Sequence, residues 1–136
     1  MEFHIVLRNK IEEIVRMTEF VDEISRELNL SVEDTFNIRL AIEEAVTNVI
    51  MYAYPQTVEG DILLSAREEG DSIVFQLVDS GNEFDPTLQP DADVTSSLED
   101  REIGGLGIFL IRQLMQSVSY SRIDGRNVLT MIKQLS

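Results

Sequence analysis

The hydrophobic positions of the chain alternate between the period of a strand and the period of a helix. Residues 3–7 carry apolar side chains at every second position, which predicts a strand with one apolar face. Over residues 10–28 apolar side chains recur every three or four positions, which predicts an amphipathic helix. Ser31, followed three positions later by an acidic residue, is typical of a helix N-cap, and Pro55 cannot continue a helix. We therefore expect a second helix over about residues 32–54.

The second half of the chain predicts two hairpins, with a loop and a helix between them. Each hairpin consists of two alternating segments around turn-forming residues. Residues 87–103 show little periodicity, so we expect a long loop there. A glycine-rich stretch at 104–107 then opens an apolar helix that reaches about Met115. The hairpins join residues 62–66 to 73–77 and residues 118–122 to 128–132.

This order of elements predicts an α+β two-layer sandwich in a single domain spanning residues 1–136. Strand, helix, helix, hairpin, loop, helix and hairpin follow one another, so the helices should cover one face of a mixed, mostly antiparallel sheet. The length suits one domain, since single domains commonly hold roughly 100–200 residues. The other face of the sheet must then be exposed to solvent or be covered by a partner.

Charge and composition narrow the classes of function. The chain has 25 acidic and 11 basic residues and a formal net charge of −14, which repels phosphate backbones, so we do not expect direct nucleic-acid binding. It has no cysteine and one histidine, His4, which leaves oxygen ligands, suited to magnesium, for any metal. There is no run of about 18 apolar residues, and residues 1–10 lack the apolar segment of a secretory signal. We therefore expect a cytoplasmic protein with no membrane segment.

Two polar residues in the second predicted helix are the first candidates for a site. Glu44 and Asn48 are four positions apart and would project from one face of an otherwise apolar segment. The alternative is that Glu44 is an ordinary solvated helix residue, as we expect for its neighbour Glu43. From the pair alone, both interpretations stay open.

Two glycine-containing stretches are further candidates. Asp79 ends a predicted strand, and Gly81 lets the backbone turn closely past a ligand, although Asp-x-Gly is also an ordinary turn. The glycines at 104–107 precede a helix, where free backbone amides and the helix dipole attract phosphate. A flexible hinge would use the same glycines.

Four blocks of sequence, taken together, resemble a known family. They are EEAVTNVIMYAY (43–54), DSGNEFDP (79–86), GGLGIFLIRQLM (104–115) and GRNVLTMIK (125–133). Their order and spacing resemble the GHKL superfamily of ATP-binding domains and, within it, the bacterial anti-sigma-factor serine/threonine kinases. The chain departs from that pattern at Met51 and Tyr52, where relatives usually carry a basic residue and a histidine.

The resemblance implies a Mg-ATP site. It makes Asn48 the ligand of the magnesium that bridges the phosphates and Glu44 the base that orients the attacking hydroxyl. Asp79 would accept a hydrogen bond from the adenine amino group. Further residues implied are Gly81, against the base; Gly105 and Gly107, with amides toward the phosphates; Thr130, supporting adenine through Asp79 or a water; and Ser96, Ser97 and Arg101 in an ATP lid at about 86–104.

The resemblance also implies a function and its partners. A stand-alone kinase of this family binds a sigma factor and phosphorylates a serine of a small anti-sigma-factor antagonist. A non-catalytic module that uses ATP only to set its affinity for a partner is the alternative. The resemblance and the uncovered sheet leave a homodimer possible.

Overall fold

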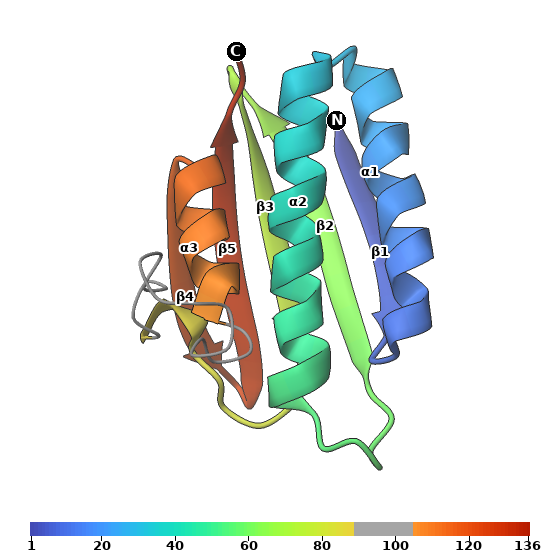
Figure 1. Ribbon diagram of the computed structural model, residues 1–136, viewed down its shortest axis with the longest axis vertical. Coiled ribbons are helices and arrows are strands. Elements are labelled where there is room, and N and C mark those ends of the chain that lie inside the picture. Colours follow the sequence, from blue (N-terminus) through green and yellow to red (C-terminus); the bar gives the residue numbers. More distant parts are fainter. Residues whose placement is uncertain (89–104) are drawn as a thin grey trace.

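The computed structural model describes residues 1–88 and 105–136 (Figure 1). Within these residues, one sheet of five strands carries helices α1, α2 and α3 on one face. In chain order the elements are β1 (Glu2–Arg8), η1 (Ile11–Glu13), α1 (Ile14–Leu28), α2 (Val32–Asn48), η2 (Val49–Ala53), β2 (Asp61–Glu69), β3 (Ser72–Asp79), η3 (Pro86–Leu88), α3 (Gly105–Leu114), β4 (Ser117–Ile123) and β5 (Arg126–Gln134).

The sheet has the strand order β1-β2-β3-β5-β4, and each neighbouring pair is antiparallel. The predicted two-layer α+β architecture with a mostly antiparallel sheet is therefore confirmed. The mixed character is corrected, because the described strands contain no parallel pair. Strands β3 and β4 run in the same direction, as a strand-helix-strand connection requires, but β5 lies between them.

Helix α1 ends, and helix α2 begins, where the sequence predicts. Helix α1 is followed by Asn29 in the left-handed conformation, with φ of 53°, a common helix end. Ser31 Oγ accepts a hydrogen bond from the Asp34 amide at 3.0 Å, so the predicted N-cap of α2 is confirmed. Met17, which lies on the apolar stripe of α1, is buried in the core.

Helix α2 is shorter than predicted. It is a regular α-helix only to Asn48, after which η2 forms a wider π-type turn over Val49–Ala53. Tyr54 has an extended backbone, which the following Pro55 favours because its ring disfavours a helical residue before it. The helical stretch as a whole therefore ends close to the predicted position, with its last turn in π rather than α geometry, and this turn places Ala53 next to Asn82, just after β3.

The core lies between the sheet and the helices, with α2 lying along the strands over the middle of the sheet (Figure 1). Along β5 the buried positions are Asn127, Leu129, Met131 and Lys133, and the positions between them face the other side. No helix among the described residues covers that other face, on which Val6 and Leu63 pair directly and are 51% and 45% exposed. The largest fully buried side chains are Phe75, Leu7, Met17, Ile24, Ile38, Ile42, Ile62, Leu64, Ile73, Leu77, Ile108 and Ile111.

Candidate functional site

The structure brings Glu44 and Asn48 together with Gly107. A Cβ atom built on Gly107 would lie 3.0 Å from Asn48 Nδ2 and 3.2 Å from Glu44 Oε2. Helix α3 begins at Gly105, so the amides of Gly105 and Gly107 belong to its first turn, where backbone N–H groups have no partner within the helix. The start of α3 therefore adds anion-attracting amides to an acid and an amide from α2.

Glu44 and Asn48 lie in different environments although they share a helix face. Asn48 is buried, Glu44 is half-buried, and Glu43 is exposed on another face, as expected. Burial raises the pKa of the Glu44 carboxyl, and the charge of Glu43 raises it further. A carboxylate with a raised pKa is a better proton acceptor than an ordinary surface glutamate.

Asp79 ends β3 as a buried carboxylate with a free oxygen. It is 2% exposed, and its Oδ1 accepts hydrogen bonds from the Gly81 amide and from Asn127 Nδ2, both at 2.9 Å. Within the described residues no donor reaches Oδ2. Burial raises the pKa of Asp79, although the Asn127 bond, the Gly81 amide and the charge of Arg122 act in the opposite direction. A free buried acceptor oxygen suits a ligand that carries an N–H group.

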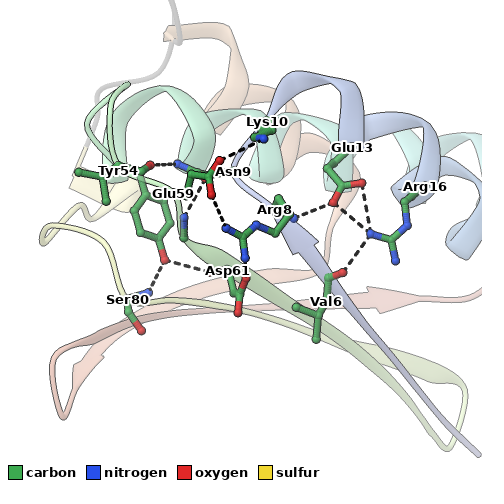
Figure 2. Close-up of polar contacts among 12 residues, drawn as sticks. Val6, Arg8, Asn9, Lys10, Glu13, Arg16, Tyr54, Glu59, Asp61 and Ser80 are labelled. Atoms are coloured by element: carbon green, nitrogen blue, oxygen red, sulfur yellow. Dashed lines mark hydrogen bonds and ion pairs between the residues drawn. The ribbon is translucent and has the colours of Figure 1, made fainter.

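The turn after Asp79 is held to η2 and its neighbours by hydrogen bonds of its backbone amides. The Ser80 amide donates to the Tyr54 hydroxyl at 2.9 Å, and that hydroxyl donates to the Asp61 carbonyl at 2.9 Å (Figure 2). The Asn82 amide donates to the Ala53 carbonyl at 2.7 Å. Buried Tyr54 thus ties the end of β3 to the start of β2 and fixes the backbone next to Asp79.

Figure 2 also shows how the segment between η2 and β2 is anchored to β1. The Arg8 guanidinium contacts Glu59 at 3.0 Å and Asp61 at 2.9 Å. Asn9 Oδ1 accepts a hydrogen bond from the Gly60 amide at 2.9 Å, and Asn9 Nδ2 donates to the Val58 carbonyl. These contacts are largely exposed and serve to position the Tyr54 side of the turn.

Gly81 lies too close to the backbone of Ala53 for any residue with a Cβ atom. A Cβ atom at this position would lie 2.5 Å from the Ala53 carbonyl oxygen and 2.8 Å from the Ala53 carbonyl carbon. Gly81 was expected to leave room for a ligand beside the backbone, and the structure adds a second role within the protein itself. Gly81 lets the turn lie close enough to η2 for the Asn82–Ala53 hydrogen bond to form.

Asn127 is the site residue that sequence reasoning missed. It lies directly opposite Asp79 in the β3–β5 register. Its Nδ2 donates to Asp79 Oδ1 and to the Asn82 carbonyl, and its Oδ1 accepts three hydrogen bonds. The donors are the Phe84 amide at 3.2 Å, the Tyr120 hydroxyl at 2.6 Å and Arg122 Nη1 at 3.0 Å. A polar residue directly across the strand pair from Asp79 was the available signal, but it requires the register.

Thr130 does not join this group, which corrects the predicted contact through Asp79. Thr130 is paired with Gln76 and Ser119, three positions along β5 from Asn127. Because side chains alternate between the two faces of a strand, Thr130 points to the face that the helices do not cover. The inward-facing positions of β5 include the polar residues Asn127 and Lys133. The apolar pattern of this strand therefore suggests the wrong face as the one buried under the helices.

A small cavity lies between the two halves of the site. Its free volume is about 20 Å³, room for a water rather than for a purine base, so part of its lining must rearrange for a base to enter. Tyr52 stacks on Phe84 with 5.4 Å between the ring centroids. The lining residues are Ala45, Asn48, Val49, Leu77, Asp79, Phe84, Pro86, Tyr120, Asn127 and Leu129.

The predicted lid and metal site are only partly within the described structure. Residues 86–88 form η3, whereas Ser96, Ser97 and Arg101 lie outside the described residues. In the part of the chain that the structure describes, no group of three or more His, Cys, Asp or Glu side chains is placed to hold a metal. None of the described helices is long and apolar enough to cross a membrane.

The family model for the histidine kinase-like ATPase domain matches residues 7–133. The chain belongs to this family. This match spans the helix with Glu44 and Asn48, the turn at Asp79 and the start of α3, so the predicted GHKL resemblance is confirmed.

Relatives in this family are kinases by name. The chain is 32% identical over 140 residues to the serine-protein kinase RsbW of Halalkalibacterium halodurans, covering 99% of this chain and 83% of that protein. It is 32% identical over 96 residues to the serine/threonine-protein kinase BtrW of Bordetella bronchiseptica, covering 71% of this chain and 68% of that protein. The predicted likeness to the anti-sigma-factor serine kinases is therefore confirmed at the level of family.

Solved structures share the fold. The RsbU and RsbW domains of Rv1364c from Mycobacterium tuberculosis match with a TM-score of 0.72 at 20% identity, covering 99% of this chain and 32% of that one. The histidine kinase domain of the blue-light activated histidine kinase EL346 from Erythrobacter litoralis matches with a TM-score of 0.56 at 15% identity, covering 92% and 60%. These two likenesses show that the fold of this chain is shared.

Proposed function

We propose that the chain is a Mg-ATP-dependent serine/threonine protein kinase that acts as an anti-sigma factor. Its substrate is a serine of an anti-sigma-factor antagonist, and its regulatory partner is a sigma factor. The observation that carries the proposal is the meeting of Glu44 and Asn48 with Gly107 at the start of α3. Membership of the histidine kinase-like ATPase family and the likeness to RsbW support it.

The residues present fit ATP and magnesium. Asp79 supplies a buried acceptor with a free oxygen for the adenine amino group, and Gly107 leaves the space beside Asn48 and Glu44 that a Cβ would fill. Asn48 is the amide ligand available to magnesium, which takes its other oxygen ligands from phosphates and water. Bound magnesium would supply neutralisation of phosphate charge.

The other roles in phosphoryl transfer fall to residues of the chain. The amides at the start of α3 stabilise negative charge on the phosphates, and Asn48 orients them. Glu44 orients the substrate hydroxyl and takes its proton as the serine oxygen bonds to the γ-phosphorus and the bond to ADP breaks. The raised pKa of Glu44 favours this acceptance.

The test is transfer of labelled γ-phosphate from ATP to the purified antagonist. Wild type should phosphorylate the serine, Glu44→Gln should lose transfer by at least about 100-fold, in the range of general-base effects, and keep ATP binding. Glu43→Gln, which removes the same charge from the exposed neighbour, is the matched control and should keep transfer. ATP binding by wild type with no transfer to the antagonist would refute the kinase and favour a module that uses ATP only to set partner affinity.

A further inference from the structure

The amide of Asn127 cannot rotate without losing hydrogen bonds on both of its ends. Its oxygen accepts from the Phe84 amide, the Tyr120 hydroxyl and Arg122, and of these the Phe84 amide and the Arg122 guanidinium can only donate. Its nitrogen must therefore point to Asp79 and to the Asn82 carbonyl. Asn127 is 5% exposed, so water does not replace these partners freely.

This locked amide fixes which oxygen of Asp79 is available. Asp79 Oδ1 accepts from Asn127 and from the Gly81 amide, and this leaves Oδ2 as the free acceptor. Both residues lie in the wall of the same cavity. An acceptor oxygen held in place selects a base with an N–H donor over a base with a carbonyl, because two facing acceptors leave a buried polar atom without a partner.

Arg122 extends the same network to the surface of β4. Its Nη1 donates to Asn127 Oδ1 and to the Gly81 carbonyl, both at 3.0 Å. The guanidinium thus holds the asparagine and the turn next to Asp79, and its positive charge favours the ionised form of that carboxylate. Arg122 itself is exposed, so it can be changed without opening the core.

We propose that Asn127 is the positioning residue for Asp79 and that, with Arg122, it sets the preference of the site for adenine over a 6-oxo purine. This inference rests on the ATP binding proposed above. Asn127 acts through Asp79 and need not touch the nucleotide itself. Its amide nitrogen is the group that keeps Asp79 Oδ1 occupied and Oδ2 free.

The sharpest variant is Asn127→Asp. It keeps the oxygen that accepts from Phe84, Tyr120 and Arg122, and it replaces the donating nitrogen by a second oxygen facing Asp79. Two carboxylates in contact bind a shared proton, and only the protonated pair can restore a donor to Asp79 Oδ1. ATP affinity of the variant should therefore fall as pH rises, whereas wild-type affinity should change little. The other charged or titratable groups that interact with Asp79 are Arg122, Tyr120 and Tyr54; Glu83 and Asp85 interact in turn with Tyr120, and Asp61 with Tyr54.

Calorimetric titration with Mg-ATP and Mg-ITP between pH 6 and pH 9 tests the proposal. ITP carries a carbonyl oxygen in place of the adenine amino group. At pH 8 and above, Asn127→Asp should bind ATP about 10- to 100-fold more weakly than wild type, the loss expected for a hydrogen bond to a charged group, and should lose most of its preference over ITP. Ser119→Asp, which adds a carboxylate on the exposed edge strand, is the matched control for charge.

A second variant covers the case in which Asn127→Asp fails to fold. Arg122→Gln should weaken ATP binding and reduce the ATP-over-ITP preference, whereas Arg126→Gln, an exposed arginine of the same hairpin, should not. If the folded Asn127→Asp and Arg122→Gln variants bind ATP with the same affinity, the same preference over ITP and the same pH dependence as wild type, this inference is wrong and the proposed function still stands. Absence of ATP binding by wild type would overturn the proposed function along with it.

Discussion

Replacement of Gly81 by alanine tests the close approach between the Asp79 turn and η2. The new methyl group would lie 2.5 Å from the Ala53 carbonyl oxygen, where an ordinary contact begins at 3.4 Å, so the two backbones must separate by about 0.9 Å. This movement strains a packed region, at about 1–3 kcal/mol, and breaks the 2.7 Å Asn82–Ala53 hydrogen bond, at about 0.5–1.5 kcal/mol. We expect Gly81→Ala to lose about 2–4 kcal/mol of unfolding free energy.

Urea unfolding measures this loss as a shift of the midpoint at unchanged slope. ATP affinity should fall as well, because the Gly81 amide holds Asp79 Oδ1. Gly70→Ala is the control, since nothing lies within 4 Å of a Cβ there and only the φ of +60° opposes it, at about 1–2 kcal/mol. A Gly81→Ala protein that is as stable as wild type and binds ATP equally well would show that the close approach of Gly81 to Ala53 supports neither the fold nor the site.

Three further predictions concern the same site and the far end of α2. Gly107→Ala should leave thermal stability equal or higher, because alanine favours a helix by about 1 kcal/mol and the atoms that it meets are side-chain ends of Asn48 and Glu44, but calorimetry should show much weaker ATP binding. Glu44→Gln should melt at a higher temperature than wild type at pH 8, because the raised pKa of Glu44 means that its charged form opposes folding above the unfolded pKa of about 4.3. This difference should vanish below about pH 4. At neutral pH, Asp34→Ala should lose about 1–3 kcal/mol in urea unfolding, because the buried Asp34 carboxylate accepts from the amide and hydroxyl of Ser136. Burial would raise the pKa of Asp34, but these bonds and the Lys133 charge lower it, so the loss should be present above about pH 4 and should shrink as acid protonates the folded carboxylate.

Hydrophobic periodicity was sufficient to predict the two layers of the fold, the sheet and the helices that cover one of its faces. The apolar stripe through Met17 places α1 on the sheet, and the Ser31 cap marks the start of α2. The order of strands in the sheet was not accessible in the same way, because the pattern of β5 does not say that it inserts between β3 and β4. That insertion decides which residue lies opposite Asp79.

The two halves of the site differed in how far the sequence could predict them. Glu44 and Asn48 share a helix face by spacing alone, so their meeting followed from the period of a helix. The neighbours of Asp79 depend on register across two strands and on a π-type turn at η2, neither of which has a local signal in the sequence. Thr130 was therefore predicted beside Asp79 where Asn127 lies, since residues an odd number of positions apart on a strand face opposite sides of the sheet.

The most direct test of the nucleotide site is calorimetric titration of Mg-ATP into wild type and into Asp79→Asn. We expect saturable binding of one ATP per wild-type chain. We expect no detectable binding to Asp79→Asn, because the amide can present a donor where the adenine amino group needs an acceptor. Equal binding by the two proteins, or none by wild type, would show that Asp79 is not the adenine acceptor of an ATP site.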